Sequence, residues 1–139
     1  EISDEAIHFL LTWTRTHTYY TQTLCNHLYA SFLKRIQEED VRNICSDLLS
    51  SQQATYIQYR RLLSPVQWQL LIAIAKEERV FQPQSKAFLA KYKIGTPANS
   101  KRALEALLDK EMIFKEEDLR NSWYQVYDVF LSRWLQLTF

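Results

Sequence analysis

The chain has 139 residues, of which 47% are hydrophobic, and its 17 basic and 16 acidic side chains give a formal net charge of +1. These values are near the average for a soluble globular protein, and no apolar run reaches the ~18 residues of a membrane span. The start shows no basic and apolar leader. Two cysteines, Cys25 and Cys45, are too few for a disulfide framework, so we expect reduced thiols and a cytoplasmic protein.

The first half of the chain has no glycine and no proline before Pro65, and its apolar residues recur at helical spacing. This spacing predicts a helix over Asp4–Trp13 with Ser3 as its N-cap, and a second helix over 17–34. A third begins at the acids 38–40, which suit a helix N-terminus, and nothing in the polar patch that follows forces it to break. The side chains predicted to face inward are Ile7, Leu10, Leu11, Tyr20, Leu24, Leu28, Phe32, Val41, Ile44, Cys45, Leu48 and Leu49.

Capping residues divide the second half into three further helices. Ser64-Pro65 predicts a helix start, because the hydroxyl accepts an unpaired N–H and proline loses no bond at the first position. Ser85 marks a short second helix, and Gly95 is expected to be the left-handed residue that ends it. Thr96-Pro97 begins the third. The apolar stripes of these helices are Leu70, Leu71, Ile74, Ala75, Phe88, Leu89, Tyr92, Ala103, Leu104, Leu107 and Leu108.

Two short strands are predicted after the third of these helices, over 112–116 and 123–127, around a charged turn at 118–121. Asp128 is expected to cap a last helix that carries Phe130, Leu131, Trp134 and Leu135.

The order helix, helix, turn, helix and hairpin is the signature of a winged helix-turn-helix. We therefore predict a mainly α protein, a helical bundle followed by a winged helix-turn-helix with a small β-hairpin. Its predicted domains are a helical, lid-like subdomain over 1–63 and a winged-helix domain over 64–139. Such a module recognises nucleic acid or protein and has no chemistry of its own.

Three segments resemble a known family. Tyr-Lys-Ile-Gly-Thr-Pro-Ala-Asn-Ser at 92–100, with 102–113, is similar to the C-terminal winged helix of prokaryotic archaeal-type P-loop ATPases of the STAND and AAA+ lineage. The ending 123–134 resembles the close of that domain, with Val129 in place of the usual proline. Residues 14–25 resemble the helical lid motif that follows the ATPase core.

The resemblance implies that the chain is the lid and winged helix of a larger ATPase. It also implies that His17 is the histidine of the lid motif and a candidate nucleotide-binding residue. The family has two glycines before this histidine and a proline after it, where this chain has Arg15, Thr16 and Thr18. ATP and magnesium are implied for the full-length parent alone.

A P-loop needs several glycines, a lysine and a magnesium-binding hydroxyl, and this chain has one glycine. We therefore expect no enzyme activity, no catalytic residue and no cofactor in the chain itself. We expect no metal site either, because Cys25 and His27 are two residues apart on a helix and cannot face one ion.

Nucleic-acid binding depends on the third helix of the winged module, which would enter a major groove. Its exposed side and the neighbouring helix offer a set of residues that could contact DNA: Lys91, Lys93, Asn99, Lys101 and Arg102. Against these stand Glu105 and Asp109 on the same helix. The wing carries three acids, Glu116, Glu117 and Asp118, against only Lys115 and Arg120. Residues 64–139 hold eleven basic and nine acidic side chains, a net of +2, which is a faint footprint for a DNA-binding domain.

Two functions from different classes remain. The first is a non-catalytic regulatory region whose winged helix engages the ATPase core of the same polypeptide or another protein. The alternative is a DNA-binding protein resembling a transcription regulator. Any DNA contact is expected to be weak, and no membrane partner is expected.

Overall fold

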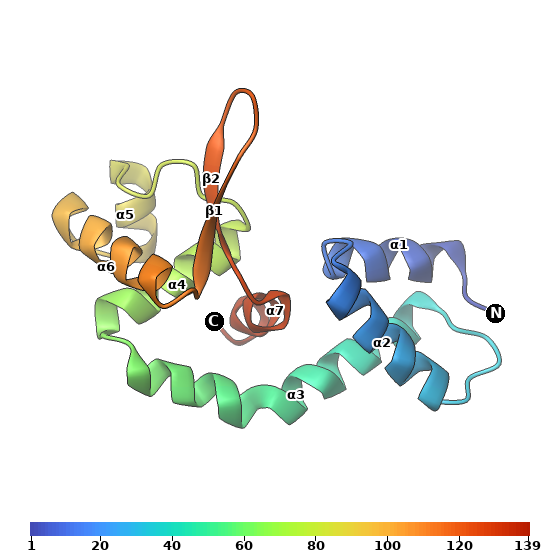
Figure 1. The fold of residues 1–139 in the computed structure, drawn as a ribbon. Coiled ribbons are helices and arrows are strands. Elements are labelled where there is room, and N and C mark those ends of the chain that lie inside the picture. The colour runs from blue at the N-terminus through green and yellow to red at the C-terminus, as the bar shows by residue number, and fades with distance from the viewer. The chain divides into compact units, whose positions relative to one another are not determined.

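The computed structural model describes residues 1–139 and has seven helices and one two-stranded sheet (Figure 1). The predicted mainly α class with a small hairpin is confirmed. The elements in chain order are α1 (Asp4–Trp13), α2 (Thr18–Ala30), α3 (Glu38–Leu62), α4 (Pro65–Glu77), α5 (Lys86–Tyr92), α6 (Pro97–Asp109), β1 (Ile113–Glu117), β2 (Ser122–Val126) and α7 (Val129–Thr138). None of the helices is long and apolar enough to cross a bilayer.

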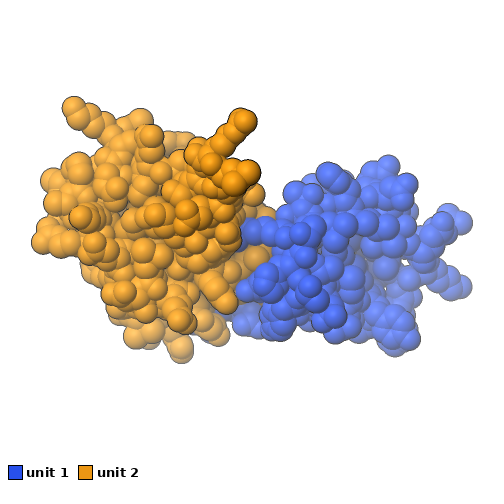
Figure 2. Space-filling model, turned by 45° about the horizontal axis from the view of Figure 1, so that its top comes forward, with its two compact units in different colours: residues 1–54 blue, residues 55–139 orange.

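The chain divides into two compact units, residues 1–54 and residues 55–139 (Figure 2). The division lies within α3, which is one unbroken helix of 25 residues through the polar patch at 50–53. The predicted boundary at 63 and 64 falls at the junction of α3 and α4.

In the first unit, α1 begins as predicted, with the Ser3 hydroxyl accepting the N–H of Ala6. Its buried face is narrower than predicted, because Ala6 and Leu10 are buried whereas Ile7 and Leu11 are 38% and 37% exposed. Residues four apart form a single stripe on a helix, and a short helix packed on one side buries little more than that stripe.

Helix α2 is shorter than predicted, ending at Ala30 rather than at residue 34. Tyr20, Leu24 and Leu28 are buried as expected, but Phe32 is 88% exposed and has a left-handed φ of 56°. The chain leaves the helix there and reaches the N-terminus, where the N–H of Ile36 donates to the carbonyl of Glu1 at 2.8 Å. This pairing fixes a helix end that the apolar spacing alone does not predict.

The second unit is built around α4. Its predicted start is confirmed, with Ser64 and Gln67 forming a reciprocal capping box and Pro65 at the first helical position. Six consecutive residues from Leu70 to Ala75 are buried. Helices α5, α6 and α7 and strand β2 all contact α4, so it is the central helix of this unit.

The hairpin pairs β1 with β2 in antiparallel register, from Ile113 opposite Val126 to Glu117 opposite Ser122. Val80, between α4 and α5, extends this sheet through two hydrogen bonds with Tyr124, of 3.0 and 2.9 Å. Asp128 caps α7 as predicted, because its carboxylate accepts the N–H of Leu131. The wing is therefore anchored to the helices on both sides.

Leu107 on α6 is fully buried, whereas Leu119 in the hairpin turn is fully exposed. We expect Leu107→Ala to lower the free energy of unfolding by about 2–5 kcal/mol, the usual cost of removing a buried leucine side chain. Leu119→Ala is the matched control and should change it by less than about 0.5 kcal/mol. Urea unfolding followed by circular dichroism measures both, and equal losses would contradict the described core.

Candidate functional site

The helix-turn-helix consists of α5, the turn at 93–96 and α6. Ser85 and Thr96 cap the two helices, accepting the N–H groups of Phe88 and Asn99. The residue that ends α5 is Lys93, in the left-handed region at φ 55° and ψ 46°, and not Gly95 as predicted. Gly95 also has a positive φ, 101°, but lies two residues farther along. The buried side chain of Ile94 stands between them and fixes the turn.

The five residues predicted to contact DNA belong to α5, the turn after it and α6, the elements of the helix-turn-helix labelled in Figure 1. We call them the basic set: Lys91, Lys93, Asn99, Lys101 and Arg102. The four cations are exposed and Asn99 is half-buried. Exposure alone, however, does not make their charges available to a partner.

Lys91 already has a partner inside the chain. Its Nζ lies 2.8 Å from Oε1 of Glu77 on α4, and the hydroxyl of Tyr92 donates to the same oxygen at 2.7 Å. The hydrogen bonds from Lys91 and Tyr92 lower the pKa of Glu77. The same contact with Glu77 raises the pKa of Lys91. The pair is therefore charged at neutral pH, and Glu77 offsets the charge that Lys91 would offer to a phosphate.

Asn99 and Arg102 are also engaged with each other. An Nη of Arg102 donates to the Oδ1 of Asn99 at 2.8 Å. Reading an adenine would need the same amide oxygen. Asn99 is neutral, so this bond leaves the charge of Arg102 in place, and Lys93, Lys101 and Arg102 are the cations of the basic set with no ion-pair partner.

The exposed face of α6 changes sign along its length. Lys101 and Arg102 lie near its N-terminus, and Glu105 and Asp109 follow on the same exposed side. Glu105 is four residues from Lys101, a spacing at which opposite charges attract on a helix surface. A DNA backbone along this helix would meet both signs.

The tip of the wing is acidic. Glu116, Glu117 and Asp118 are all exposed, and Leu119 beside them projects into solvent. The backbone N–H groups of Arg120 and Asn121 donate to the Asp118 carboxylate at 2.8 and 2.7 Å and lower its pKa. Lys115 and Arg120 are exposed in the same hairpin, so three carboxylates outnumber two cations where a DNA-binding wing would carry an excess of cations.

Two features of this surface are absent from the sequence prediction. One is the Glu77 contact with Lys91, and the other is Arg79, whose guanidinium lies 4.5 Å from the ring centre of Trp123. Both depend on chain segments far apart in sequence, the second through the pairing of Val80 with Tyr124. No local pattern signals either contact.

His17 lies in the other unit, as the exposed N-cap residue of α2, and its side chain makes no capping hydrogen bond. Its ring lies 4.9 Å from that of Tyr20. The chain contains no group of three or more His, Cys, Asp or Glu side chains that could hold a metal ion.

A family model described as a probable winged helix domain matches residues 54–137. This range covers α4 to β2 and nearly all of α7, together with the end of α3. No curated protein and no solved structure matches the chain.

The contact between Glu77 and Lys91 predicts that the stability of the fold depends on pH. The pKa of Glu77 is lower in the folded chain than its ordinary value of 4.5. The carboxylate therefore stabilises the fold fully at pH values above 4.5, and this stabilisation is lost as the pH falls through the lower pKa of the folded chain. We therefore expect Glu77→Gln to be less stable than the natural chain at pH 7, with the difference decreasing as the pH falls below 4.5.

Thermal unfolding across this pH range measures the effect. Glu105→Gln is the matched control, because it removes an exposed carboxylate that forms no ion pair. A Glu77→Gln difference that stays constant from pH 7 to pH 3 would contradict the proposed contact.

Proposed function

The chain belongs to the winged helix family, and we propose that its helix-turn-helix and wing recognise a protein surface rather than a DNA sequence. The observation that carries the proposal is that part of the basic set is already engaged inside the chain. Glu77 offsets Lys91, and Asn99 engages Arg102. A partner of mixed charge would complement α6 and the acidic wing better than a uniformly negative duplex.

We further propose that the partner is the core of a P-loop ATPase, either in the same polypeptide or in another protein. The resemblance at 92–113 and 123–134 supports this, as does the lid-like segment at 14–25. In this role the chain is a non-catalytic regulatory region, and ATP with magnesium would belong to the core. The surface of α6 and the wing would then bind one nucleotide state of the core more tightly than another.

Hydrogen exchange on the longest natural form of the protein tests this proposal. We expect that form to contain a glycine-rich P-loop and to bind ATP. Exchange at α6 and the wing should slow in one nucleotide state. A natural protein without a P-loop, or equal exchange in all nucleotide states, would contradict the ATPase-linked role.

The DNA-binding alternative has its own supporting observation. Lys93, in the turn, and Lys101 and Arg102, on α6, are exposed cations without an ion-pair partner on the motif that contacts DNA in a helix-turn-helix. Three such contacts can neutralise only a few phosphates. The DNA-binding alternative therefore predicts weak binding to DNA without sequence preference.

We predict that the isolated chain does not bind or hydrolyse ATP. It has a single glycine, and no run of residues can form a phosphate-binding loop. Isothermal titration calorimetry with Mg-ATP should detect no binding at micromolar concentrations. Micromolar affinity would refute the prediction, and its loss in His17→Ala would assign the site to the lid motif.

Any DNA binding should be salt-sensitive and should depend on the basic set. A few phosphate contacts give a slope of log affinity against log salt on the order of −2 to −4. Lys101→Ala with Arg102→Ala should abolish binding to a duplex in fluorescence anisotropy. Replacing Glu116 and Glu117 with Gln, and Asp118 with Asn, should tighten binding to the duplex.

Leu119→Ala is the control in the same turn, since it removes exposed surface without changing charge. Unchanged affinity in both charge variants would show that the duplex binds elsewhere on the chain.

A further inference from the structure

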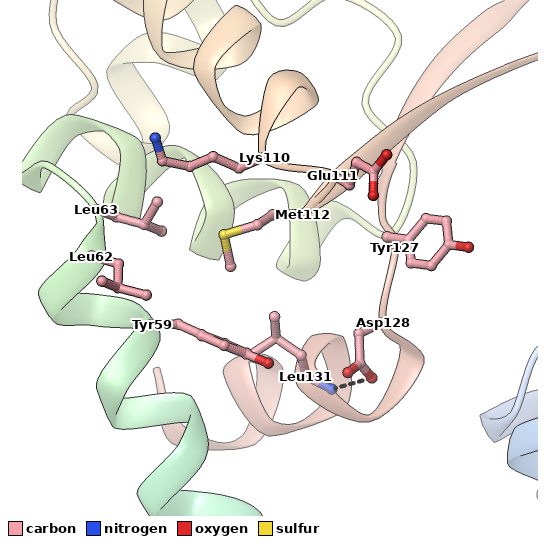
Figure 3. A pocket seen from close by; sticks show the side chains of 9 residues that line it. All are labelled: Tyr59, Leu62, Leu63, Lys110, Glu111, Met112, Tyr127, Asp128 and Leu131. Carbon is pink, nitrogen blue, oxygen red and sulfur yellow. Dashed lines mark hydrogen bonds between the residues drawn. The ribbon is translucent and has the colours of Figure 1, made fainter.

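A cavity of about 500 Å³ opens where the end of α3, the turn between α6 and β1 and the start of α7 meet (Figure 3). All of its lining residues belong to the unit of residues 55–139. Its volume lies in the usual range of ligand sites. It includes no residue of the basic set and none of the wing tip, so it is separate from the surface described above.

The cavity is apolar inside and continues as an apolar rim. Leu63 and Leu131 are buried in its wall, and the flexible side chain of Met112 reaches between them (Figure 3). At the mouth, Leu62 is 73% exposed and Tyr127 is 62% exposed. Large apolar side chains around an apolar cavity form a surface that gains free energy when a partner covers it.

The mouth of the cavity has more acidic than basic side chains. Glu111 and Asp128 lie on one side and Lys110 on the other (Figure 3). One Asp128 oxygen accepts the N–H of Leu131 at 3.2 Å, and Glu111 and Lys110 form no ion pair. Two carboxylates against one ammonium favour a cationic partner and disfavour a fatty acid or a phosphate.

We propose that this cavity docks a peptide segment of a partner protein. The segment inserts one large apolar side chain between Leu63, Met112 and Leu131 and presents a Lys or Arg to Glu111 and Asp128. Apolar anchors with flanking charges are a common mode of peptide recognition. The exposed Leu62 and Tyr127 favour a peptide over a small molecule, because they extend the apolar contact beyond the cavity. This inference depends on the cavity and its charges and does not depend on an ATPase partner.

A pair of matched peptides tests the proposal on the whole 139-residue chain. Both are labelled, helix-forming peptides with one central leucine; one has arginines beside it and the other has glutamates at the same positions. Fluorescence anisotropy should give at least about tenfold tighter binding of the arginine peptide. Amide shifts in two-dimensional NMR should centre on Leu63, Met112 and Leu131.

Two exposed variants separate the apolar and charged contributions. Leu62→Ser should weaken binding of the arginine peptide by at least about fivefold, through loss of apolar contact. Glu111→Asn should reduce its preference over the glutamate peptide, and asparagine tolerates the left-handed backbone of Glu111, with φ 57°. Leu119→Ser, the same change as Leu62→Ser at the wing tip, is the control and should leave affinity unchanged.

Several results would overturn the proposal. These are no binding of either peptide at millimolar concentration, equal binding of both, or amide shifts on α5 and α6 instead of around the cavity. Tighter binding of laurate than of the arginine peptide would assign the cavity to a fatty acid. Self-association that Leu62→Ser abolishes would assign it to a second copy of the chain.

Discussion

Burial of α4 is the constraint on which the winged-helix unit depends. An amphipathic surface helix buries one stripe, whereas Leu70 to Ala75 are buried without interruption. Helices α5, α6 and α7 and strand β2 surround it, so one central helix positions both the helix-turn-helix and the wing. Polar contacts fix α7 against the end of α4. The side-chain amide of Gln136 donates to the carbonyl of Ala75, and Arg133 pairs with Glu78 at 2.9 Å. The helix-turn-helix and the wing are thus both packed on the same buried helix, α4.

The parts of this fold that are predictable from sequence are those set by local chemistry. Ser64 and Thr96 start helices because a hydroxyl satisfies an unpaired N–H wherever the chain allows it. Helix ends are less predictable, since α5 ends at Lys93 rather than at the glycine, and a left-handed lysine costs about 1 kcal/mol that tertiary packing must offset. The basic set follows from helical spacing, but its compensation by Glu77 does not, because no local pattern brings α4 to α5.

That compensation separates the two functions open to a winged helix. Attraction to a duplex grows with the number of phosphates neutralised, and here an acidic wing and an ion-paired Lys91 reduce that number. The exposed face of α6 has basic residues followed by acidic residues, and a protein surface of mixed charge can complement both. The cavity beside α7 adds an apolar site with two carboxylates and one ammonium group at its mouth. Both surfaces of the unit therefore support the proposed protein-binding role.

The central claim is that the helix-turn-helix does not read a DNA sequence. Selection from a random duplex library by the longest natural form of the protein, at physiological salt, tests it most directly. The account predicts that no motif is enriched over successive rounds. Enrichment of one motif that the protein binds with nanomolar affinity, and that Lys101→Ala with Arg102→Ala releases, would contradict it and establish the chain as a sequence-specific DNA-binding protein.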